Sequence, residues 1–208
     1  MTRYRLVIFD FDGTLADSAE WFVKSYNKLA GELGLRAVVE ADLPMLRALT
    51  TREIMAFLKV PPWKLPRLSK RMREQAGIEA DRIKLFPGID TLLPALKERG
   101  VTLAIVSSNS EDNVRKVLGP MNVACIDVLD CSASLLGKAR KLRAVIKRCG
   151  VTPQQTLCIG DELRDIDAAR EVGADAASVL WGYAAEAALV KHKPTHVLRS
   201  VGDIVTLL

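Results

Sequence analysis

The sequence predicts an α/β protein in which a Rossmann-like, doubly wound parallel sheet carries a small all-helical domain. In residues 1–16 and 86–208, short apolar runs alternate with segments of helical periodicity, as in a parallel sheet with helices on both faces. Polar side chains directly follow several of these runs, at the sheet edge where ligands bind in such folds. Residues 17–85 show helical patterns only, so we expect them to form the inserted helical domain.

Length and composition fit a globular core with a small insertion. The chain has 208 residues, of which 49% are hydrophobic and 26% are charged. No apolar run approaches the roughly 20 residues that span a bilayer, and the N-terminus reaches its first acidic residues too early for a signal peptide. We therefore expect a cytoplasmic protein with no membrane partner, as a monomer or a homodimer.

Other residue types narrow the classes of function. The two histidines, His192 and His196, both lie near the C-terminus, so the sequence offers little support for a histidine-based catalytic triad. The four cysteines show no CxxC spacing, which argues against a zinc site. The net charge of +5 has its densest basic run at residues 138–148. We favour a solvated helix face over a nucleic-acid partner for that run.

The first element is a predicted buried strand at residues 6–9, a short apolar run that ends at a turn signal. Asp10 and Asp12 follow it, and side chains two residues apart on a strand point to the same side. The two carboxylates repel each other, and a hard cation such as Mg²⁺ would relieve the repulsion. A plain surface turn is the alternative, since Asp and Gly favour turns. We favour the cation site because an acid directly follows so apolar a strand.

The inserted segment begins with a predicted helix that Asp17 or Ser18 would cap and that Gly34 would end. Further helical pieces are predicted at 41–49, 51–58 and 62–79. No strand is expected in this segment before about residue 85.

Arg47 and Arg52 are the candidates for substrate contact within this segment. They flank a helix break at Thr50 and Thr51, so two guanidinium groups and two hydroxyls lie close together. Guanidinium groups suit the recognition of a carboxylate or a phosphate. An ordinary exposed turn between two helices explains the same residues equally well, and both interpretations stay open.

The chain returns to the core at residues 86–88, and a helix over 89–99 leads into a strand at 103–106. Ser107 and Ser108 directly follow that strand, which makes them candidates for a ligand contact. The alternative is that these serines only cap the next helix, a role that suits Ser110. We favour a functional role for Ser107.

The second half continues with strands at 125–129 and 157–159, separated by the basic helix. The latter strand runs into Asp161, Glu162 and Asp165, at the start of an amphipathic helix. Composition alone also allows Asp165 to be a helix cap. Strands near 176–180 and 195–198 and a final helix complete the core, and Trp181 and Tyr183 are expected to pack without a chemical role.

Two motifs carry a resemblance to a known family. The segment LVIFDFDGTLADS contains DxDGT(L/V), the first motif of the haloacid dehalogenase superfamily, and GDELRD at 160–165 matches its fourth, GDxxxD. The chain therefore resembles this superfamily, and in architecture its phosphoglycolate phosphatase-like members, in which a helical cap lies between the first and second motifs. The resemblance implies a core domain of residues 1–16 and 86–208 and a cap domain of residues 17–85.

The resemblance also implies roles for the candidates. Asp10 would be the nucleophile that forms an aspartyl-phosphate, and Asp12 the general acid and base, which Thr14 would orient. The third motif of the family is a lysine that neutralises the nucleophile and the phosphate. This lysine would be Lys138 in the GKxxxL form of the motif, because the KPxP form is absent; Lys141 is the second choice. The expected substrate contacts are Thr14, Ser107, Ser108, Arg47 and Arg52. The expected Mg²⁺ ligands are Asp10, Asp12, Asp161 and Asp165, with Glu162 as a weaker candidate.

The implied activity is the Mg²⁺-dependent hydrolysis of a small phosphorylated metabolite. A phosphomutase similar to β-phosphoglucomutase shares all four motifs and differs mainly in its cap. A haloacid dehalogenase would not need the second acid, Asp12. A non-catalytic binding protein would be expected to lose one or more motif acids, and none is missing.

Overall fold

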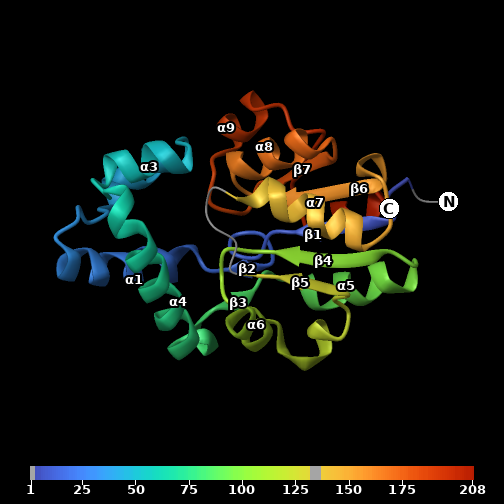
Figure 1. Cartoon of the computed structure of the whole chain (residues 1–208), viewed down its shortest axis with the longest axis horizontal. Helices are drawn as coiled ribbons and strands as arrows, with labels where there is room; N and C mark the ends of the chain where they lie inside the picture. Colours follow the sequence, from blue (N-terminus) through green and yellow to red (C-terminus); the bar gives the residue numbers. More distant parts are fainter. Residues whose placement is uncertain (1–2, 132–136) are drawn as a thin grey trace.

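The structure is a computed structural model that describes residues 3–131 and 137–208. Its centre is a six-stranded parallel sheet in the order β5-β4-β1-β6-β7-β8. Figure 1 shows this sheet on the right, with a group of helices beyond its strand ends. The strands are β1 Leu6–Phe9, β4 Thr102–Val106, β5 Val128–Asp130, β6 Thr156–Gly160, β7 Asp175–Val179 and β8 His196–Leu198. The predicted α/β fold is confirmed.

The strand order places two neighbouring strand ends at a natural ligand site. The chain builds the sheet outward from β1 through β4 to β5, and then returns to β6 on the other side of β1. The order therefore reverses between β1 and β6. Loops leave such a reversal in opposite directions, which opens a crevice at the carboxyl ends of the two strands.

Helices cover both faces of the sheet because its strands are apolar on both sides. Val7 and Phe9 of β1 point into one hydrophobic cluster, and Leu6 and Ile8 point into the other, as the alternation of a strand requires. The helices of the first face are α5 Ile89–Glu98, α6 Glu111–Val123 and α10 Asp203–Thr206. Those of the second face are α7 Lys138–Arg148, α8 Leu163–Val172 and α9 Glu186–Lys191.

Helix α7 explains most of the basic run at 138–148. Leu142, Val145 and Ile146 are buried against the sheet, while Arg143 points outward and pairs with Glu171 at 2.8 Å. The run is therefore largely the solvated face of a core helix, with Lys138 as a buried exception. The strand predicted at 125–129 is observed at Val128–Asp130, so it begins three residues later and ends one residue later, because residues 124–126 close the turn after α6.

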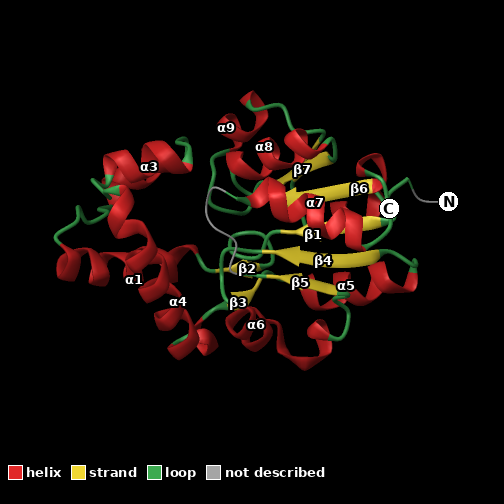
Figure 2. Ribbon diagram, viewed as in Figure 1, coloured by secondary structure: helices red, strands yellow, loops and turns green. Residues whose placement is uncertain are grey.

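A second group of helices stands at the carboxyl ends of the strands, on the side to which the arrowheads point in Figure 2. The helices are α1 Ala19–Leu33, α2 Leu43–Leu46, α3 Thr51–Phe57 and α4 Leu65–Ile78. They share a small apolar core of their own, which includes Tyr26, Leu29, Leu58 and Leu68. Gly34 ends α1 in the left-handed conformation, with φ 63°, as predicted. Among the helices described, none has the length and apolar character needed to cross a membrane.

The two passages between the helical group and the sheet run side by side. Strands β2 Ala16–Asp17 and β3 Lys84–Leu85 pair in an antiparallel ribbon, with Ala16 opposite Leu85. The sequence predicted no strand at 84–85, since two residues are too few to show alternation. We propose that the boundaries of the cap domain, residues 17–85, lie in this ribbon.

Candidate active site

Three buried carboxylates meet where β1 and β6 end. Asp10 follows β1, Asp161 follows β6, and Asp165 lies in the first turn of α8; their residues are 3%, 0% and 6% exposed. Because β1 and β6 are paired neighbours, the strand ends bring the acids together. One oxygen of each lies within 4.8 Å of the others, so this cluster could hold a metal ion.

Two cations face this cluster. The Nζ of Lys138 lies 3.0 Å from Oδ2 of Asp10 and 2.6 Å from Oδ1 of Asp165. Burial alone would lower the pKa of Lys138, but the charges of Asp10 and Asp165 outweigh burial and raise that pKa above its ordinary value. The guanidinium of Arg164 lies 3.8 Å from Oδ2 of Asp10 and 2.7 Å from Oε1 of Glu162. Lys138 is therefore charged beside Asp10.

The cluster has an excess of negative charge. The carboxylates of Asp10, Asp161, Glu162 and Asp165 outnumber the cations Lys138 and Arg164. Within the described parts of the chain, Oδ2 of Asp10 is also a buried oxygen that accepts no hydrogen bond. A divalent cation among these oxygens would balance the charge and complete the coordination of Asp10, so the residues fit such an ion.

Asp161 accepts a hydrogen bond on each of its two carboxylate oxygens. Its Oδ1 accepts a hydrogen bond from the hydroxyl of Thr14 at 2.9 Å, and its Oδ2 accepts one from the backbone N–H of Tyr183 at 2.8 Å. Burial, followed by the charges of Glu162, Asp165 and Asp10, raises the pKa of Asp161 well above its usual value. The hydroxyl of Thr14 thus donates its hydrogen bond to Asp161, and not to Asp12 as the sequence predicted.

Asp165 is bound on both of its oxygens. Oδ1 accepts from Lys138, and Oδ2 accepts from the backbone N–H groups of Asp161 at 3.1 Å and Glu162 at 3.0 Å. Burial would raise the pKa of Asp165, but Lys138 and Arg164 lower it below its usual value. Asp165 therefore stays ionised and holds both Lys138 and the loop after β6 in place.

Glycines let two loops approach Asp161 closely. A Cβ on Gly13, which has φ +78°, would lie 2.3 Å from Oδ2 of Asp161. A Cβ on Gly182 would lie 2.2 Å from the Cβ of Asp161 and 2.5 Å from the carbonyl oxygen of Gly13. Neither position has room for a side chain, so these loops depend on glycine for their contact with the cluster.

Replacing Gly182 by alanine is expected to lower the free energy of unfolding by about 1–3 kcal/mol, the usual effect of overpacking. Urea unfolding measures it. Gly31→Ala is the matched control, because Gly31 lies in α1 with nothing within 4 Å of an added Cβ. Alanine there should raise the free energy of unfolding by up to about 1 kcal/mol. Equal effects of the two substitutions would contradict the close packing around Asp161.

Asp12 is separated from the cluster and faces a cavity. Its Oδ1 accepts from the hydroxyl of Ser18 at 3.0 Å, and its Oδ2 accepts from the side-chain amide of Asn109 at 3.1 Å. Burial and the charge of Asp10 raise the pKa of Asp12 to about 6, although the two hydrogen bonds act in the opposite direction. Near neutral pH this group can therefore both give and take a proton.

The three serines that follow β4 make different contacts. Ser107 is 1% exposed, and its hydroxyl accepts a hydrogen bond from the backbone N–H of Asn109 at 3.0 Å. The hydroxyl of Ser110 accepts from the N–H of Asn113 at 3.3 Å and caps α6, as predicted. Ser108 lines the cavity beside Asp12.

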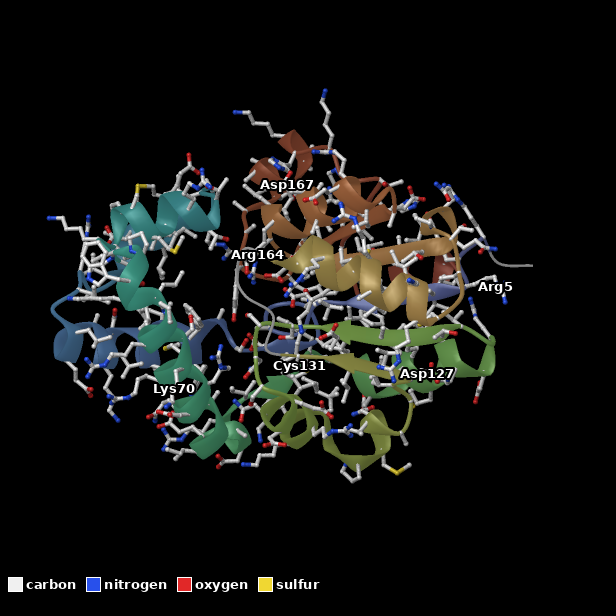
Figure 3. The ribbon with its side chains drawn as sticks, in the orientation of Figure 1. Arg5, Lys70, Asp127, Cys131, Arg164 and Asp167 are labelled. Carbon is white, nitrogen blue, oxygen red and sulfur yellow. The ribbon has the colours of Figure 1, made fainter. Side chains whose placement is uncertain are left out.

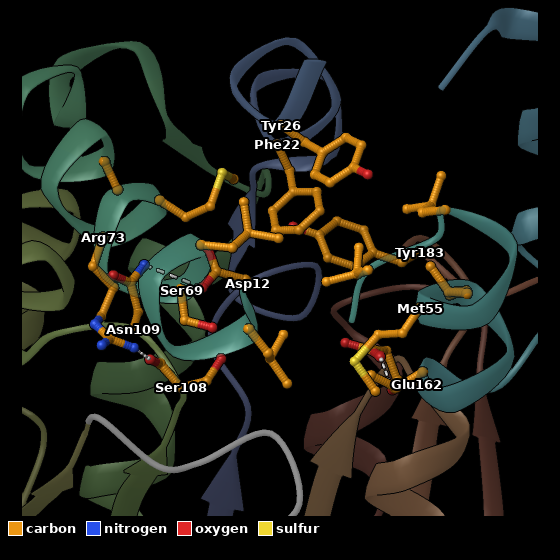
Figure 4. A pocket seen from close by; sticks show the side chains of 18 of the residues that line it. Asp12, Phe22, Tyr26, Met55, Ser69, Arg73, Ser108, Asn109, Glu162 and Tyr183 are labelled. Atoms are coloured by element: carbon orange, nitrogen blue, oxygen red, sulfur yellow. Dashed lines mark hydrogen bonds between the residues drawn. The ribbon is translucent and has the colours of Figure 1, made fainter. Parts of the chain in front are cut away.

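The cavity lies between the sheet and the second group of helices and has a volume of about 520 Å³. Figure 4 shows Asn109 and Ser108 on one side of it, Met55 near Glu162 on the other, Phe22 and Tyr26 at the top, and Asp12 between them. Its polar end is lined by Asp12, Ser108, Asn109, Glu162, Arg164 and Tyr183. Figure 3 places Arg164 on the side of the core that faces the helical group, far from Arg5 at the opposite end.

Comparison with known proteins agrees with this geometry. The family model described as haloacid dehalogenase-like hydrolase matches residues 7–179, which contain the acids, the lysine and the helical insertion. The chain belongs to this haloacid dehalogenase-like hydrolase family. The resemblance predicted from the two motifs is confirmed.

The relatives of this haloacid dehalogenase-like hydrolase match over nearly the whole chain. A phosphoglycolate phosphatase of Synechococcus elongatus is 35% identical over 200 residues, which cover 96% of this chain and 94% of the relative. A phosphoglycolate phosphatase of Aquifex aeolicus is 26% identical over 98% of this chain and 96% of the relative. Among solved structures, a haloacid dehalogenase-like family hydrolase from Streptococcus pneumoniae superposes with a TM-score of 0.81 at 20% identity, covering 99% of both chains.

The structure of this haloacid dehalogenase-like hydrolase does not bring Arg47 and Arg52 to the cavity. The guanidinium of Arg47 donates to the carbonyl oxygen of Gly182 at 3.1 Å, and Arg52 is exposed. Neither residue lines the cavity, whereas Thr51 between them does and donates to Glu162 at 3.4 Å. The segment therefore reaches the core through Thr51, and Arg47 fastens it to the loop after β7.

Sequence reasoning missed three residues of the site. Asn109 holds Asp12, Arg164 faces Asp10, and the hydroxyl of Tyr183 lies 2.7 Å from that of Ser18, which in turn holds Asp12. Each follows a strand of the sheet within a few positions. Their position just beyond the carboxyl ends of strands, where ligands gather in such sheets, is the signal in the sequence that points to these three residues.

Proposed function

We propose that this chain is a phosphatase that hydrolyses a small phosphate monoester, with Mg²⁺ bound, through a covalent aspartyl-phosphate on Asp10. The observation that carries the proposal is the placement of Asp10: buried at the end of β1, 3.0 Å from the Nζ of Lys138, and two residues from an acid whose pKa is about 6. Relatives that match over almost the full length are named phosphoglycolate phosphatases, which supports this reaction class.

In the first step, a carboxylate oxygen of Asp10 attacks phosphorus, and the bond between phosphorus and the leaving oxygen breaks. Asp12 in its protonated form gives its proton to that oxygen, so the alcohol leaves neutral. Asp12 lines the cavity, and Ser18 and Asn109 fix the direction of its carboxyl group.

In the second step, Asp12 is a carboxylate and accepts a proton from water as the water oxygen attacks phosphorus. The bond between phosphorus and Asp10 breaks, inorganic phosphate leaves, and Asp12 is again protonated. A pKa of about 6 suits this alternation, because neither form of Asp12 is rare near neutral pH.

Charge on the phosphoryl oxygens needs fixed positive groups around it. We assign this task to Lys138, with the hydroxyl of Ser107 as a hydrogen-bond donor at the neighbouring strand end. Mg²⁺, when bound, would supply further stabilisation of phosphoryl charge. The carboxylates of Asp10, Asp161 and Asp165 would hold it, and the family resemblance implies the main-chain carbonyl of Asp12 as a further ligand.

Removal of divalent cations with EDTA is expected to abolish hydrolysis of p-nitrophenyl phosphate, and added Mg²⁺ should restore it. Inorganic phosphate should be released in equal amount to the alcohol, whereas a phosphomutase would retain the phosphoryl group in its product. Hydrolysis that continues at full rate in EDTA would contradict the proposed metal dependence.

Mg²⁺ is also expected to raise the melting temperature. A ligand at 100 times its dissociation constant stabilises a protein by about 2.7 kcal/mol, or roughly 5–10 °C for a chain of this size. Asp161→Asn should remove most of the shift, because it removes a charge of the cluster. Asp167→Asn is the control, since Asp167 is exposed on α8 and pairs with His192. A shift kept in the Asp161 variant would place the metal elsewhere.

A further inference from the structure

We propose that the preferred substrate of this enzyme is a phosphate monoester with a neutral, apolar leaving group of several carbon atoms, which the cavity beneath the helical cap receives. The inference rests on the proposed phosphatase function and names the substrate class for the same site. It comes from the asymmetry of the cavity, which has a charged end at the sheet and an apolar end among the cap helices.

The cap side of the cavity is built from large apolar side chains. Helix α1 contributes Trp21, Phe22 and Tyr26, helix α3 contributes Ile54 and Met55, and helix α4 contributes Leu68 and Met72. Figure 4 shows Phe22 and Tyr26 together at the upper edge of the cavity, above Asp12 in this view. A ligand that covered these side chains would remove apolar surface from water, which favours binding in proportion to the area covered.

The polar groups of two of these aromatic residues are already occupied outside the cavity. The indole N–H of Trp21 donates to Glu79 at 2.9 Å, and the hydroxyl of Tyr26 donates to the carbonyl oxygen of Arg36 at 2.9 Å. What the two residues offer a ligand is therefore the ring and not a hydrogen bond. Phe22 is 44% exposed, so its ring also has surface that a ligand could cover.

The cations near the cavity are placed for the phosphoryl group. In the part of the lining that the structure describes, the cations are Arg73 and Arg164. Arg164 is paired with Glu162 and lies 3.8 Å from Asp10, so it belongs to the reacting end. Arg73 lies beside Ser108, 3.5 Å from its carbonyl oxygen, and thus also near the polar end. Among the described cap side chains that line the cavity, the cation is Arg73 of α4, so a second anionic group away from Ser108 would have no described cation beside it.

The size of the cavity supports the same conclusion. Its volume of about 520 Å³ lies within the range of roughly 300–1,000 Å³ that is typical of sites for small organic ligands. A two-carbon leaving group would leave most of that space to water against apolar walls. An alkyl or aryl group of six or more carbon atoms would replace that water with contacts to the rings and methyl groups of the cap.

The test is kcat/KM of the Mg²⁺-loaded enzyme for ethyl, butyl and hexyl phosphate, whose leaving alcohols have nearly the same chemistry. Each added methylene that becomes buried is expected to raise kcat/KM by about fourfold, so hexyl phosphate, with four more carbon atoms, should exceed ethyl phosphate by roughly 250-fold. A terminal carboxylate on the six-carbon chain should remove most of that gain. Equal values across the series, or preference for the carboxylated ester or 2-phosphoglycolate over hexyl phosphate, would overturn the inference.

Two variants tie the effect to the cavity. The double variant Phe22→Ser, Met55→Ser should reduce the ratio of hexyl to ethyl phosphate by about tenfold or more, while Trp63→Ser, at an apolar cap residue 78% exposed outside the cavity, should keep the ratio. An unchanged ratio in the double variant would overturn the assignment of the cavity. If wild type hydrolyses ethyl phosphate in a manner that requires Asp10 but shows no chain-length dependence, only this inference fails. If no ester is hydrolysed, the proposed function fails and the inference fails with it.

Discussion

Replacing Asp10 by asparagine is expected to lower kcat for any phosphate monoester by about 10⁶-fold, the loss typical of an enzyme without its nucleophile. The amide cannot form the acyl phosphate, and no other carboxylate of the cluster has the place of Asp10 between Lys138 and Arg164. Single-turnover measurements with a rapidly hydrolysed aryl phosphate give the loss, and denaturing mass spectrometry detects the phosphorylated chain in wild type only.

Folding should not confound that result. Asp10 is a buried acid in a cluster with an excess of negative charge, so its removal also relieves repulsion. The control is Asp130→Asn, which changes another acid at a strand end, the last residue of β5. Its activity should stay within a few-fold of wild type. Full activity of the Asp10→Asn protein, after contaminating phosphatases are excluded, would remove Asp10 from the role of nucleophile.

Lys138→Met is expected to give the largest loss of stability among single substitutions at the site. Lys138 neutralises both Asp10 and Asp165, and all three side chains are almost fully buried. Removal of one partner from a buried ion pair leaves uncompensated charge and costs about 3–5 kcal/mol. Because the same ammonium lies 3.0 Å from Asp10, where we propose that the phosphoryl group binds, activity should also fall by on the order of 10²–10³-fold. Urea unfolding and steady-state kinetics measure the two effects.

Lys141→Met is the matched control, one turn further along α7. Lys141 pairs with Asp130 at the partly exposed end of β5, so its loss should cost about 1 kcal/mol or less and leave kcat within a few-fold. Lys141 was the second choice for the motif lysine on sequence alone. A larger loss of activity in Lys141→Met than in Lys138→Met would transfer the role to Lys141.

Strand ends made most of this site predictable. Buried parallel strands are continuous apolar runs, so the polar residue that ends each run is conspicuous, as Asp10, Ser107 and Asp161 are. Strand order was not visible in the sequence. However, Asp10, Ser107, Asp161 and, after the short strand β5 and its loop, Lys138 have compatible chemistry, which implied that these side chains meet at one site. The motif spacing then separated Lys138 from Lys141, a choice that composition could not make.

Contacts between the cap and the core were not predictable in the same way. Arg47 and Arg52 fitted a substrate site by chemistry, yet a rotation of about 100° per residue on a helix decides which side chains face inward. In the structure, the side chain that points toward the cavity is that of Thr51, while Arg47 donates to a carbonyl oxygen of the core loop after β7. Tyr183 and Asn109 were missed because their part in the site depends on the side-chain partners Ser18 and Asp12, which are 165 and 97 positions away in the chain.

The ribbon of β2 and β3 makes the two halves of this enzyme exchangeable. The chain leaves the core at Ala16 and re-enters it at the paired Leu85, so a tight turn could join these neighbours and delete everything between them. The core keeps most of both hydrophobic clusters, with Ala76, Ile83 and the partly buried Trp21 lost from one, and the cap has a core of its own. A cap from a relative could be grafted at the same two positions, which would transplant specificity and keep the reacting groups at the strand ends in place, provided that the graft retains the serine at position 18 that donates to Asp12.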